Sequence, residues 1–381
     1  MTKVLQVIDA LNVGGAQELL ALMAKHKGEA FSMAVCVLQP VTDLQARIEA
    51  HGVAVYALNR TRVSILHPLG FLRYSLGNLL DILRICRDER VDILHAHLSD
   101  AEFLGFFATL LGRTRRFCTT VHTPRLLPEG QGHGLRNLAR RLLMRVIYAK
   151  AEKVIAVSRD TAGLLRRQSG VDPAKLLTIA NGVETEAIAR HRPAFGRDAL
   201  GLAPTDTILL CVGRLTLAKG HRHLLEAMRL LAASMPAVKL LVAGDGELRE
   251  ELTELARSLG VADRVLFLGA RTDIPDLLAL CDLYVSASVF EGTSLAVMEA
   301  MAAGKPIVAT NIPGNLELLE DGANAVLVPP ADAPKLAEAI TRLAGDATLA
   351  ETLGRSAQHK AYAEFDIMAV IRKYVAAWGI R

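Results

Sequence analysis

Several features that would assign this 381-residue chain to other protein classes are missing from its sequence. No apolar run reaches the about 18 residues that a membrane-spanning helix needs. The N-terminus does not follow the basic, apolar, small-residue order of a secretory signal peptide. The five cysteines are scattered and form no Cys-x-x-Cys pair, so we expect reduced core residues. These absences favour a protein of the cytoplasm.

Motifs for a metal ion or a dinucleotide are missing as well. No Asp-x-Asp sequence occurs in the chain, and the histidine pairs have no carboxylate or cysteine at zinc-ligand spacing. Gly14-Gly15 departs from the dinucleotide fingerprint Gly-x-Gly-x-x-Gly, and no acidic residue ends a second strand where the ribose of NAD would need it. The sequence therefore predicts neither a bound metal nor a resident cofactor.

Length and charge describe a globular protein with an uneven charge distribution. Hydrophobic residues make up 51% of the chain and charged residues 22%, and a chain of this length normally folds as two domains. The net charge is +4, yet residues 113–167 alone hold 13 basic and 3 acidic side chains. The excess of positive charge is therefore concentrated in one segment.

This basic segment also carries apolar residues at helical spacing. Leu142 and Val146 lie among arginines such as Arg136 and Arg140. A basic amphipathic helix can bind an anionic membrane surface or a phosphorylated acceptor, and it can equally be a solvated helix face. Nucleic acid is not expected, because the segment has few aromatic residues and no known binding motif. We expect residues 113–167 to contact the inner face of the cell membrane or a phosphate.

Short apolar, β-branched runs alternate with helical patterns, such as 16–27 and 74–89, along the whole chain. Alternation of this kind indicates parallel sheets covered by helices on both faces. Two such series predict an α/β protein with two doubly wound, Rossmann-like domains. The expected strands are 4–8, 33–38, 53–57, 93–96, 116–121, 153–157, 207–212, 239–243, 265–268, 283–286, 306–309 and 325–328.

The boundary between the two series falls near Asn181-Gly182, a turn signal after a last strand of the first domain. The sequence predicts an acceptor-side domain over 1–182 and a second domain over 183–363, with a polar linker at 190–206. The segment 364–381 has a helical pattern with no strand after it, so we expect a helix that packs back on the first domain. Because ligands of open parallel sheets bind at the carboxyl ends of strands, the two sheets should face each other across a cleft.

The segment from Glu291 to Glu299 contains two glutamates around a glycine and two hydroxyl residues. An apolar strand precedes it and helix formers follow it, so 291–294 should be a strand-to-helix turn. A helix start offers unpaired N–H groups and a partial positive charge to a phosphate, and Gly292 allows close approach. Glu299 lies about two turns further along the same face, where its carboxylate can accept two sugar hydroxyls. The alternative is an ordinary capped helix, with one of the hydroxyl residues as N-cap.

Two cations follow another predicted strand. Arg214 can bind a phosphate through two parallel hydrogen bonds and Lys219 adds a point charge, so together they suit a diphosphate. The alternative is a loop with two solvated cations.

In the first half, His97 and His122 end two strands at the same edge of the sheet. The backbone of 269–271 follows a further strand and has a free edge that can read a nucleobase.

Together these motifs resemble one known family. The chain resembles the retaining glycosyltransferases of family 4, also called glycosyl transferases group 1, which have the GT-B fold. One departure is Gly292-Thr293-Ser294, where many members carry Gly-Phe-Gly. The resemblance extends over nearly the whole chain. Its matching pieces are Gly14-Gly15, His95-Ala96-His97, Val121-His122-Thr123, Asn181-Gly182-Val183, Val212-Gly213-Arg214-Leu215 with Lys219-Gly220, Gly244-Asp245-Gly246, Glu291 with Glu299, and 298–310.

The resemblance implies a role for each matching residue. Transfer would proceed with retention and without a metal, because Arg214 and Lys219 would hold the diphosphate of a UDP-, GDP- or ADP-sugar in place of a cation. Glu299 would bind the ribose and Glu291 the donor sugar, while His122 would contact the sugar near its reacting carbon. Further residues expected to bind the donor are Gly14, Gly15, Gly269, Ala270, Arg271, Gly292, Thr293, Ser294 and Leu295, and those expected on the acceptor side are His97, Arg136 and Arg140.

Three functions are open at this point. The first is a glycosyltransferase that moves a sugar to a saccharide or lipid-linked saccharide in cell-surface glycan or glycolipid biosynthesis. The second is an epimerase or hydrolase that acts on the nucleotide sugar itself, and the third is a non-catalytic nucleotide-sugar-binding subunit. The basic segment favours a separate acceptor, and the intact set of charged motif residues favours an enzyme.

Overall fold

The computed structural model describes residues 1–12, 14–64, 66–122 and 135–380, with the side chains of 135–141 outside the description. Contacts divide the chain into two compact units. Unit 1 comprises Met1–Asn181 and Ile367–Arg381, and unit 2 comprises Gly182–Asp366. Each unit contains its own parallel sheet.

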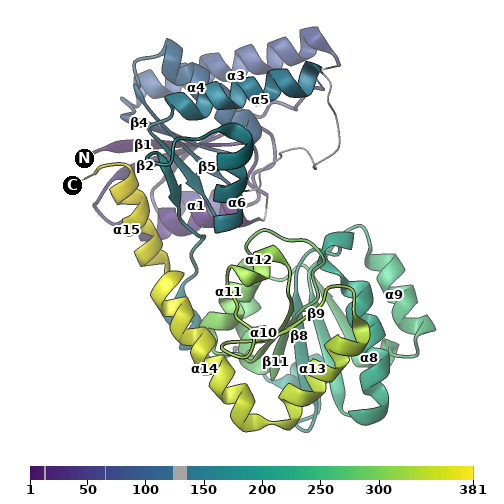
Figure 1. Cartoon of the computed structure of the whole chain (residues 1–381). Helices are drawn as coiled ribbons and strands as arrows, with labels where there is room; N and C mark the ends of the chain where they lie inside the picture. The colour runs from purple at the N-terminus through teal and green to yellow at the C-terminus, as the bar shows by residue number, and fades with distance from the viewer. Residues whose placement is uncertain (13, 65, 123–134, 381) are drawn as a thin grey trace. The chain divides into compact units, whose positions relative to one another are not determined.

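Among the described residues, unit 1 forms a seven-stranded parallel sheet of order β3-β2-β1-β4-β5-β6-β7 (Figure 1). Its central strands β1 and β4 are buried on both faces, which explains their mainly apolar sequences, interrupted by Gln6, His95 and His97. The order reverses between β1 and β4, so the carboxyl ends of these two strands flank a topological switch point. The strands are β1 (Lys3–Ile8), β2 (Ser32–Val37), β3 (Ala54–Ala57), β4 (Ile93–His97), β5 (Arg116–Val121), β6 (Lys153–Ala156) and β7 (Leu176–Thr178).

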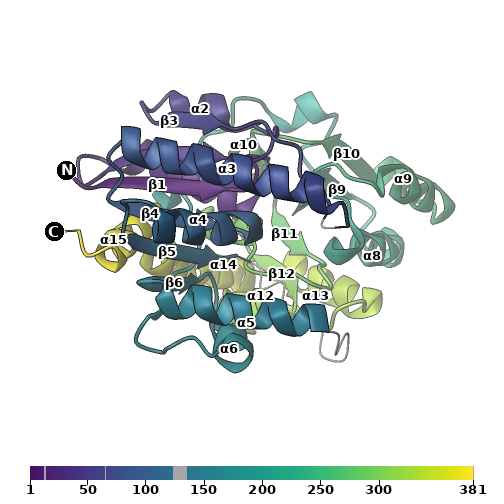
Figure 2. The ribbon, with the colours of Figure 1, turned by 90° about the horizontal axis from the view of Figure 1, so that it is seen from above.

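Helices cover both faces of the unit 1 sheet (Figures 1 and 2). Over one face α3, α4 and α5 lie side by side, with α6 and the π-helical turn η1 packed into the same apolar core. The other face is covered by α1, α2 and α15, and Trp378 at the end of α15 is fully buried there. The bounds are α1 (Gly15–His26), α2 (Gln45–Glu49), α3 (Pro68–Asp88), α4 (Ser99–Leu111), α5 (Leu135–Lys150), α6 (Arg159–Leu164), η1 (Leu165–Ser169) and α15 (Ile367–Ala377).

Unit 2, all of whose residues are described, has a six-stranded parallel sheet of order β10-β9-β8-β11-β12-β13. Its strands are β8 (Thr207–Val212), β9 (Val238–Ala243), β10 (Val265–Gly269), β11 (Leu283–Ser286), β12 (Ile307–Thr310) and β13 (Val326–Val328). The main apolar core lies under α8, α9 and α13, and α10 and α11 pack against the sheet outside this core. The helices are α7 (Thr185–Ala189), η2 (Arg197–Leu200), η3 (Leu217–Lys219), α8 (His221–Ser234), α9 (Arg249–Ser258), η4 (Ala262–Arg264), α10 (Ile274–Leu280), α11 (Leu295–Ala302), α12 (Pro313–Leu316), α13 (Ala333–Gly345) and α14 (Ala347–Glu364).

The helix predicted over 16–27 is shifted by one residue, as α1 (Gly15–His26), and two further helices differ more from their predicted bounds. α3 begins at Pro68 rather than at residue 74, because proline suits the first turn of a helix. The helix expected over 364–381 is interrupted, with α14 ending at Glu364 and α15 beginning at Ile367. The Phe365 carbonyl accepts the N–H of Val183 at 2.9 Å, which draws the chain out of the helix at this point.

The described residues contain no helix that is both long and apolar enough to cross a membrane. All five cysteines are buried and have free thiols, as the sequence predicts.

Candidate active site

The strand order of unit 2 reverses between β8 and β11, and the loops that follow these strands contact each other. Val289 and Phe290, after β11, donate their N–H groups to the carbonyl of Ala218, after β8, at 2.9 and 3.2 Å. Ligands of open parallel sheets bind at such a switch point. Lys219 and Glu291 lie on these two loops.

Lys219 and Glu291 form an ion pair. Their side chains are 22% and 13% exposed, and the hydroxyl of Ser288 donates to the second Glu291 oxygen at 2.9 Å. The Thr310 hydroxyl donates in turn to the Ser288 carbonyl at 2.5 Å. The structure thus brings together the ammonium expected on the diphosphate and the carboxylate expected on the donor sugar.

The loop after β8 is tightly folded around Lys219. A Cβ at Gly213 would lie 3.2 Å from Lys219 Cε and 3.5 Å from Nζ, so the lysine side chain passes directly over this glycine. Arg214 follows and is exposed. Gly220 has φ +65°, and a Cβ there would lie 2.0 Å from the Ala287 carbonyl oxygen, so glycine is required where the two loops meet.

The start of α11 has no side-chain cap. Ser294 is the N-cap residue, yet its side chain makes no capping hydrogen bond, and the buried Thr293 hydroxyl has no partner among the described residues. The capped-helix alternative therefore does not describe this helix, and the N–H groups at its start suit an anion. The preceding turn is closely packed, since a Cβ at Gly314 would lie 1.7 Å from the Gly292 carbonyl oxygen.

Glu299 lies in the second turn of α11, after Leu295 opens the helix, and both residues are partly exposed. Burial raises the pKa of Tyr284 in β11, and the nearby charges of Glu291 and Glu299 raise it further. Both glutamates of the motif therefore lie close to the same buried phenol.

Backbone contacts fix the end of β10. Gly269 has φ +70°, and its carbonyl accepts the N–H of Gly244 at 2.7 Å. Arg271 forms an ion pair with Asp273, with Nε 2.7 Å from Oδ1, and Ala270 is exposed. The guanidinium of Arg271 is therefore engaged within unit 2.

The corresponding switch point of unit 1 lies between β1 and β4. Asp9, directly after β1, accepts the N–H groups of Ala101 at 2.8 Å and Asp100 at 3.4 Å near the start of α4. Burial, and then the Asp100 carboxylate, raise the pKa of Asp9 to about 6. Gly14 precedes α1, which begins at Gly15. The predicted glycine pair thus opens a helix beside the switch point.

Histidines from β4 and the end of β5 form a hydrogen-bonded layer. His97 Nδ1 lies 3.1 Å from His122 Nε2, and the ring of His95 stacks on that of His97 with centroids 4.7 Å apart. Burial lowers the pKa of His95 to about 3 and that of the partly exposed His122 to about 4. Burial also lowers the pKa of His97 well below its usual value. All three rings are therefore neutral at pH 7.

Three residues of this layer were not predicted from the sequence. Gln6 Oε1 lies 2.8 Å from His97 Nε2, and Trp378 Nε1 donates to His95 Nδ1 at 2.8 Å. The Tyr374 hydroxyl lies 3.2 Å from Thr120 Oγ1 in the same layer. Two signals pointed to them: a carboxamide within an otherwise apolar strand, and the single tryptophan of the chain in its last helical segment.

The acceptor-side predictions have different outcomes. His97 is 0% exposed, so it is not available for direct contact with an acceptor and instead lies behind His122. The spacing of residues could not reveal this burial, because strand alternation shows only that His97 and His122 lie on the same face of the sheet. Arg136 and Arg140 belong to the helical backbone of α5, but their side chains lie outside the described residues.

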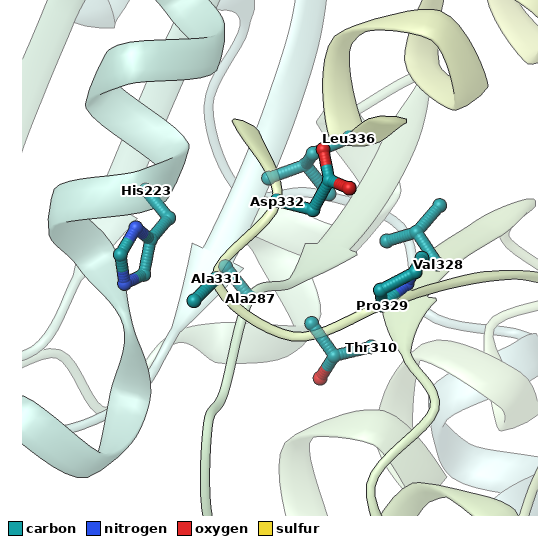
Figure 3. Close-up of a pocket in the computed structure, with 8 residues that line it drawn as sticks. All are labelled: His223, Ala287, Thr310, Val328, Pro329, Ala331, Asp332 and Leu336. Carbon is teal, nitrogen blue, oxygen red and sulfur yellow. The ribbon is translucent and has the colours of Figure 1, made fainter. Parts of the chain in front are cut away.

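A small recess lies near the carboxyl ends of β11, β12 and β13 (Figure 3). Its lining includes Thr310, His223 from α8 and Asp332, which caps α13. The recess encloses no space of the size of a water molecule. We therefore assign no ligand to it.

Two families of known proteins match the chain, one over most of unit 1 and the other over most of unit 2. The family described as Glycosyltransferase Family 4 matches residues 13–187, and the family described as Glycosyl transferases group 1 matches residues 195–360. The UDP-Gal:alpha-D-GlcNAc-diphosphoundecaprenol alpha-1,3-galactosyltransferase of Escherichia coli is 27% identical over 311 residues, 78% of each chain. The N-acetylgalactosamine-N,N'-diacetylbacillosaminyl-diphospho-undecaprenol 4-alpha-N-acetylgalactosaminyltransferase of Campylobacter jejuni is 26% identical over 292 residues, 76% of each chain.

Solved structures share the fold. The Anabaena protein Alr3699/HepE in complex with UDP and glucose has a TM-score of 0.83 at 23% identity, with 100% of both chains covered. A glycosyltransferase from Rickettsia africae ESF-5 has a TM-score of 0.84 at 22% identity, with 98% of this chain and 97% of that chain covered. Since two adjoining family profiles and the two parallel sheets agree, the chain belongs to the glycosyltransferases of family 4 and group 1, and it is a glycosyltransferase with the GT-B fold.

Proposed function

We propose that this enzyme transfers a sugar from a UDP-, GDP- or ADP-sugar to a hydroxyl of a saccharide or lipid-linked saccharide, with retention of configuration and without a metal ion. The product would be a cell-surface glycan or glycolipid assembled in the cytoplasm, at the inner face of the membrane. The observation that carries the proposal is the meeting of Lys219, Glu291 and the start of α11 at the switch point of unit 2.

The groups at this point suit the two halves of a nucleotide sugar. In such a donor the sugar is attached directly to the outer phosphate, so a cation for the phosphate and a carboxylate for the sugar hydroxyls must lie side by side. Lys219 and Glu291 meet this requirement, because they are in contact. Arg214, exposed at the start of the same loop, supplies a second cation for the diphosphate.

The proposed chemistry is stabilisation of the leaving group. As the bond between the sugar and the diphosphate breaks, negative charge grows on the phosphate oxygens. Lys219, Arg214 and the N–H groups at the start of α11 would neutralise this charge. Glu291 would hold the sugar, Glu299 the ribose, and His122 of unit 1 would accept a hydrogen bond from the sugar near its reacting carbon.

The relatives support both the donor and the acceptor. The names of the E. coli and C. jejuni enzymes give a saccharide linked to diphospho-undecaprenol as the acceptor, and Alr3699/HepE was crystallised with UDP and glucose. We therefore rank a UDP-sugar as the first donor to test and a lipid-diphosphate-linked saccharide as the first acceptor.

We also propose contact with an anionic membrane through the layer formed by α3, α4 and α5 (Figure 2). On α5, within the basic segment, Leu142 and Val146 are each 50% exposed beside the exposed Arg145. α3, on the other side of α4, adds an exposed stripe at helical spacing that the sequence analysis missed. This leucine stripe consists of Leu69, Leu72, Leu76 and Leu80, which are 79%, 60%, 50% and 56% exposed.

Vesicle flotation tests the membrane contact. The enzyme should float with vesicles of phosphatidylglycerol and much less with vesicles of phosphatidylcholine, because both apolar and electrostatic terms are needed. The double variant L72E/L76E should lose binding. The matched control is L316E in unit 2, where an equally exposed leucine lies outside the layer. Equal flotation of all three proteins would refute the contact.

A donor panel tests the proposed function. UDP-, GDP- and ADP-sugars are compared by thermal shift, and the sugar that stabilises the enzyme is then offered with a lipid-diphosphate-linked saccharide. Transfer with release of the nucleoside diphosphate and retention at the anomeric carbon is expected, with undiminished rate in excess EDTA. Epimerisation or hydrolysis of the donor without an acceptor would favour the rival enzyme class. Tight binding without turnover would favour a binding subunit.

A further inference from the structure

A chain of hydrogen bonds and ring stacking runs from α15 along one face of the unit 1 sheet to His122. Trp378 Nε1 donates to His95 Nδ1 at 2.8 Å, and His95 Nε2 lies 2.8 Å from Thr120 Oγ1. His95 stacks on His97, with an angle of 8° between the rings. These side chains lie on one face of the sheet because they alternate along β4 and β5 with residues of the opposite core.

The contacts of His95 define its tautomer. An indole N–H can only donate, so His95 Nδ1 must accept, and the proton of the neutral ring lies on Nε2. That N–H then donates to Thr120. Trp378 itself is firmly held, since it is 0% exposed and its ring meets Phe31 edge-on at 5.0 Å.

Gln6 defines the next two rings in the same way. A carboxamide oxygen can only accept, so the contact of Gln6 Oε1 places a proton on His97 Nε2. His97 Nδ1 must then accept from His122 Nε2–H at 3.1 Å. The remaining nitrogen of His122, Nδ1, therefore carries the lone pair.

Two energetically unfavourable features lie next to His97. The buried Nε2 of Gln6 has no hydrogen-bond partner among the described residues. Leu98, directly after His97, has φ 73° and ψ 171°, a region of the backbone map that is populated almost only by glycine. Surrounding contacts must hold both in place, and such concentrations of strain are typical of functional sites.

We propose that Gln6 and His97 are positioning residues, which hold His122 with its proton on Nε2 and its Nδ1 as an acceptor for a substrate hydroxyl. Trp378 supports this arrangement by fixing the ring of His95 on which His97 stacks. The proposal rests on the role of His122 in the proposed function.

The tautomer can be measured without turnover. Full-length enzyme labelled with 15N-histidine is examined by two-bond 1H–15N correlation at about pH 7.5, and the variant H122Q identifies the His122 signals. An unprotonated Nδ1 and a protonated Nε2 are expected on His122. A His122 ring with the proton on Nδ1 would overturn the proposal, whatever the enzyme does with a donor.

Kinetics test the positioning role. Asparagine can place a polar atom where His97 Nδ1 lies, so H97N should retain most of the wild-type kcat, while H97L and Q6L should lose about tenfold with little change in the KM for donor. N78L is the matched control, because Asn78 is also a fully buried carboxamide and bonds to Arg60 instead. It should lower Tm and leave kcat unchanged.

The double variant H122A/Q6L tests whether Gln6 acts through His122. If Gln6 acts through His122, the double variant should be no slower than H122A. A loss in Q6L that adds fully to that of H122A, or equal kcat for H97N and H97L, would refute the positioning role. Near-normal kcat of H122A itself would instead refute the role of His122 in the proposed function, and the NMR result would still stand.

Discussion

The side chains of Lys219 and Glu291 form an ion pair that joins the loops after β8 and β11. Both side chains are mostly buried, with 22% and 13% exposed, so removing one partner would leave the other charge poorly solvated. Replacing either residue should therefore lower stability as well as change catalysis, and the free energy of unfolding of each variant is measured beside its kcat. The donor-site variants can then be interpreted in terms of chemistry.

The first prediction concerns the two cations. K219A and R214A should each lower kcat by roughly 10²-fold or more, since one group that stabilises a developing charge is worth ~3–4 kcal/mol. Initial rates at saturating donor measure the effect. K335A removes an exposed lysine of α13 that pairs with Glu338, and it should be as active as the wild type. Normal turnover in both cation variants would be incompatible with the proposed diphosphate site.

The second prediction assigns Glu299 to donor binding. E299A should raise the KM for the nucleotide sugar by about tenfold or more and change kcat little, because ribose hydroxyls are bound alike in the ground and transition states. E351A, which removes an exposed carboxylate of α14, is the control. An unaltered KM for donor in E299A would contradict the assignment to the ribose.

The third prediction concerns the close packing of Gly314 against the turn before α11. In G314A the added Cβ would meet the Gly292 carbonyl oxygen at 1.7 Å, so the turn before α11 must move. We expect weaker donor binding and a loss of about 1–3 kcal/mol in stability. At Gly345 nothing lies within 4 Å of an added Cβ, so G345A should leave both properties nearly unchanged. Calorimetric titration with the donor nucleotide and urea unfolding give the two measurements, and equal behaviour of the two variants would disprove the close packing.

The fourth prediction is a loss of stability in mild acid. Burial lowers the pKa of His95 to about 3, lowers that of His97 as well, and lowers those of His122 and His221 to about 4. The unfolded chain therefore takes up protons below pH 6.5 that the folded chain does not. Between about pH 7.5 and about pH 5.5 each ring should reduce the free energy of unfolding by about 1.4 kcal/mol. Asp9 has the opposite effect, because its raised pKa of about 6 lets the folded state bind a proton that the unfolded state does not. Over the same pH range this adds about 1 kcal/mol to the free energy of unfolding.

Urea unfolding at the two pH values measures the net change, which we expect to be a loss of about 5 kcal/mol. The variant H51Q removes an exposed histidine and should show the same loss. An unfolding free energy that is equal at both pH values would contradict neutral burial of these four rings.

The sequence predicted the strands well because each is a short apolar run between polar segments. β5, β8 and β11 have the predicted bounds, since burial on both faces leaves a clear boundary in composition. Helix ends were less accurate. The interruption after Glu364 depends on hydrogen bonds to Val183 and Thr185, which no local pattern reveals.

Within the candidate site, the sequence could place residues on loops but could not pair them. Lys219 and Glu291 are 72 residues apart, and their contact follows from the strand order rather than from spacing. His97 could be assigned to the end of a strand, while its full burial among Gln6, His95 and His122 depends on contacts between strands. Gln6 was overlooked because a single polar residue in a strand has no characteristic motif.

The place of α15 has a consequence for the order of events during synthesis. Trp378 and Tyr374 complete the core of unit 1, yet they belong to the last fifteen residues of the chain, 367–381. While the ribosome is still translating unit 2, one side of the first sheet therefore lacks its covering helix, and Trp378 is not yet present to bind His95. Nascent unit 1 should bind chaperones until α15 has been synthesised, and the histidine layer should be assembled only once Trp378 can reach the sheet.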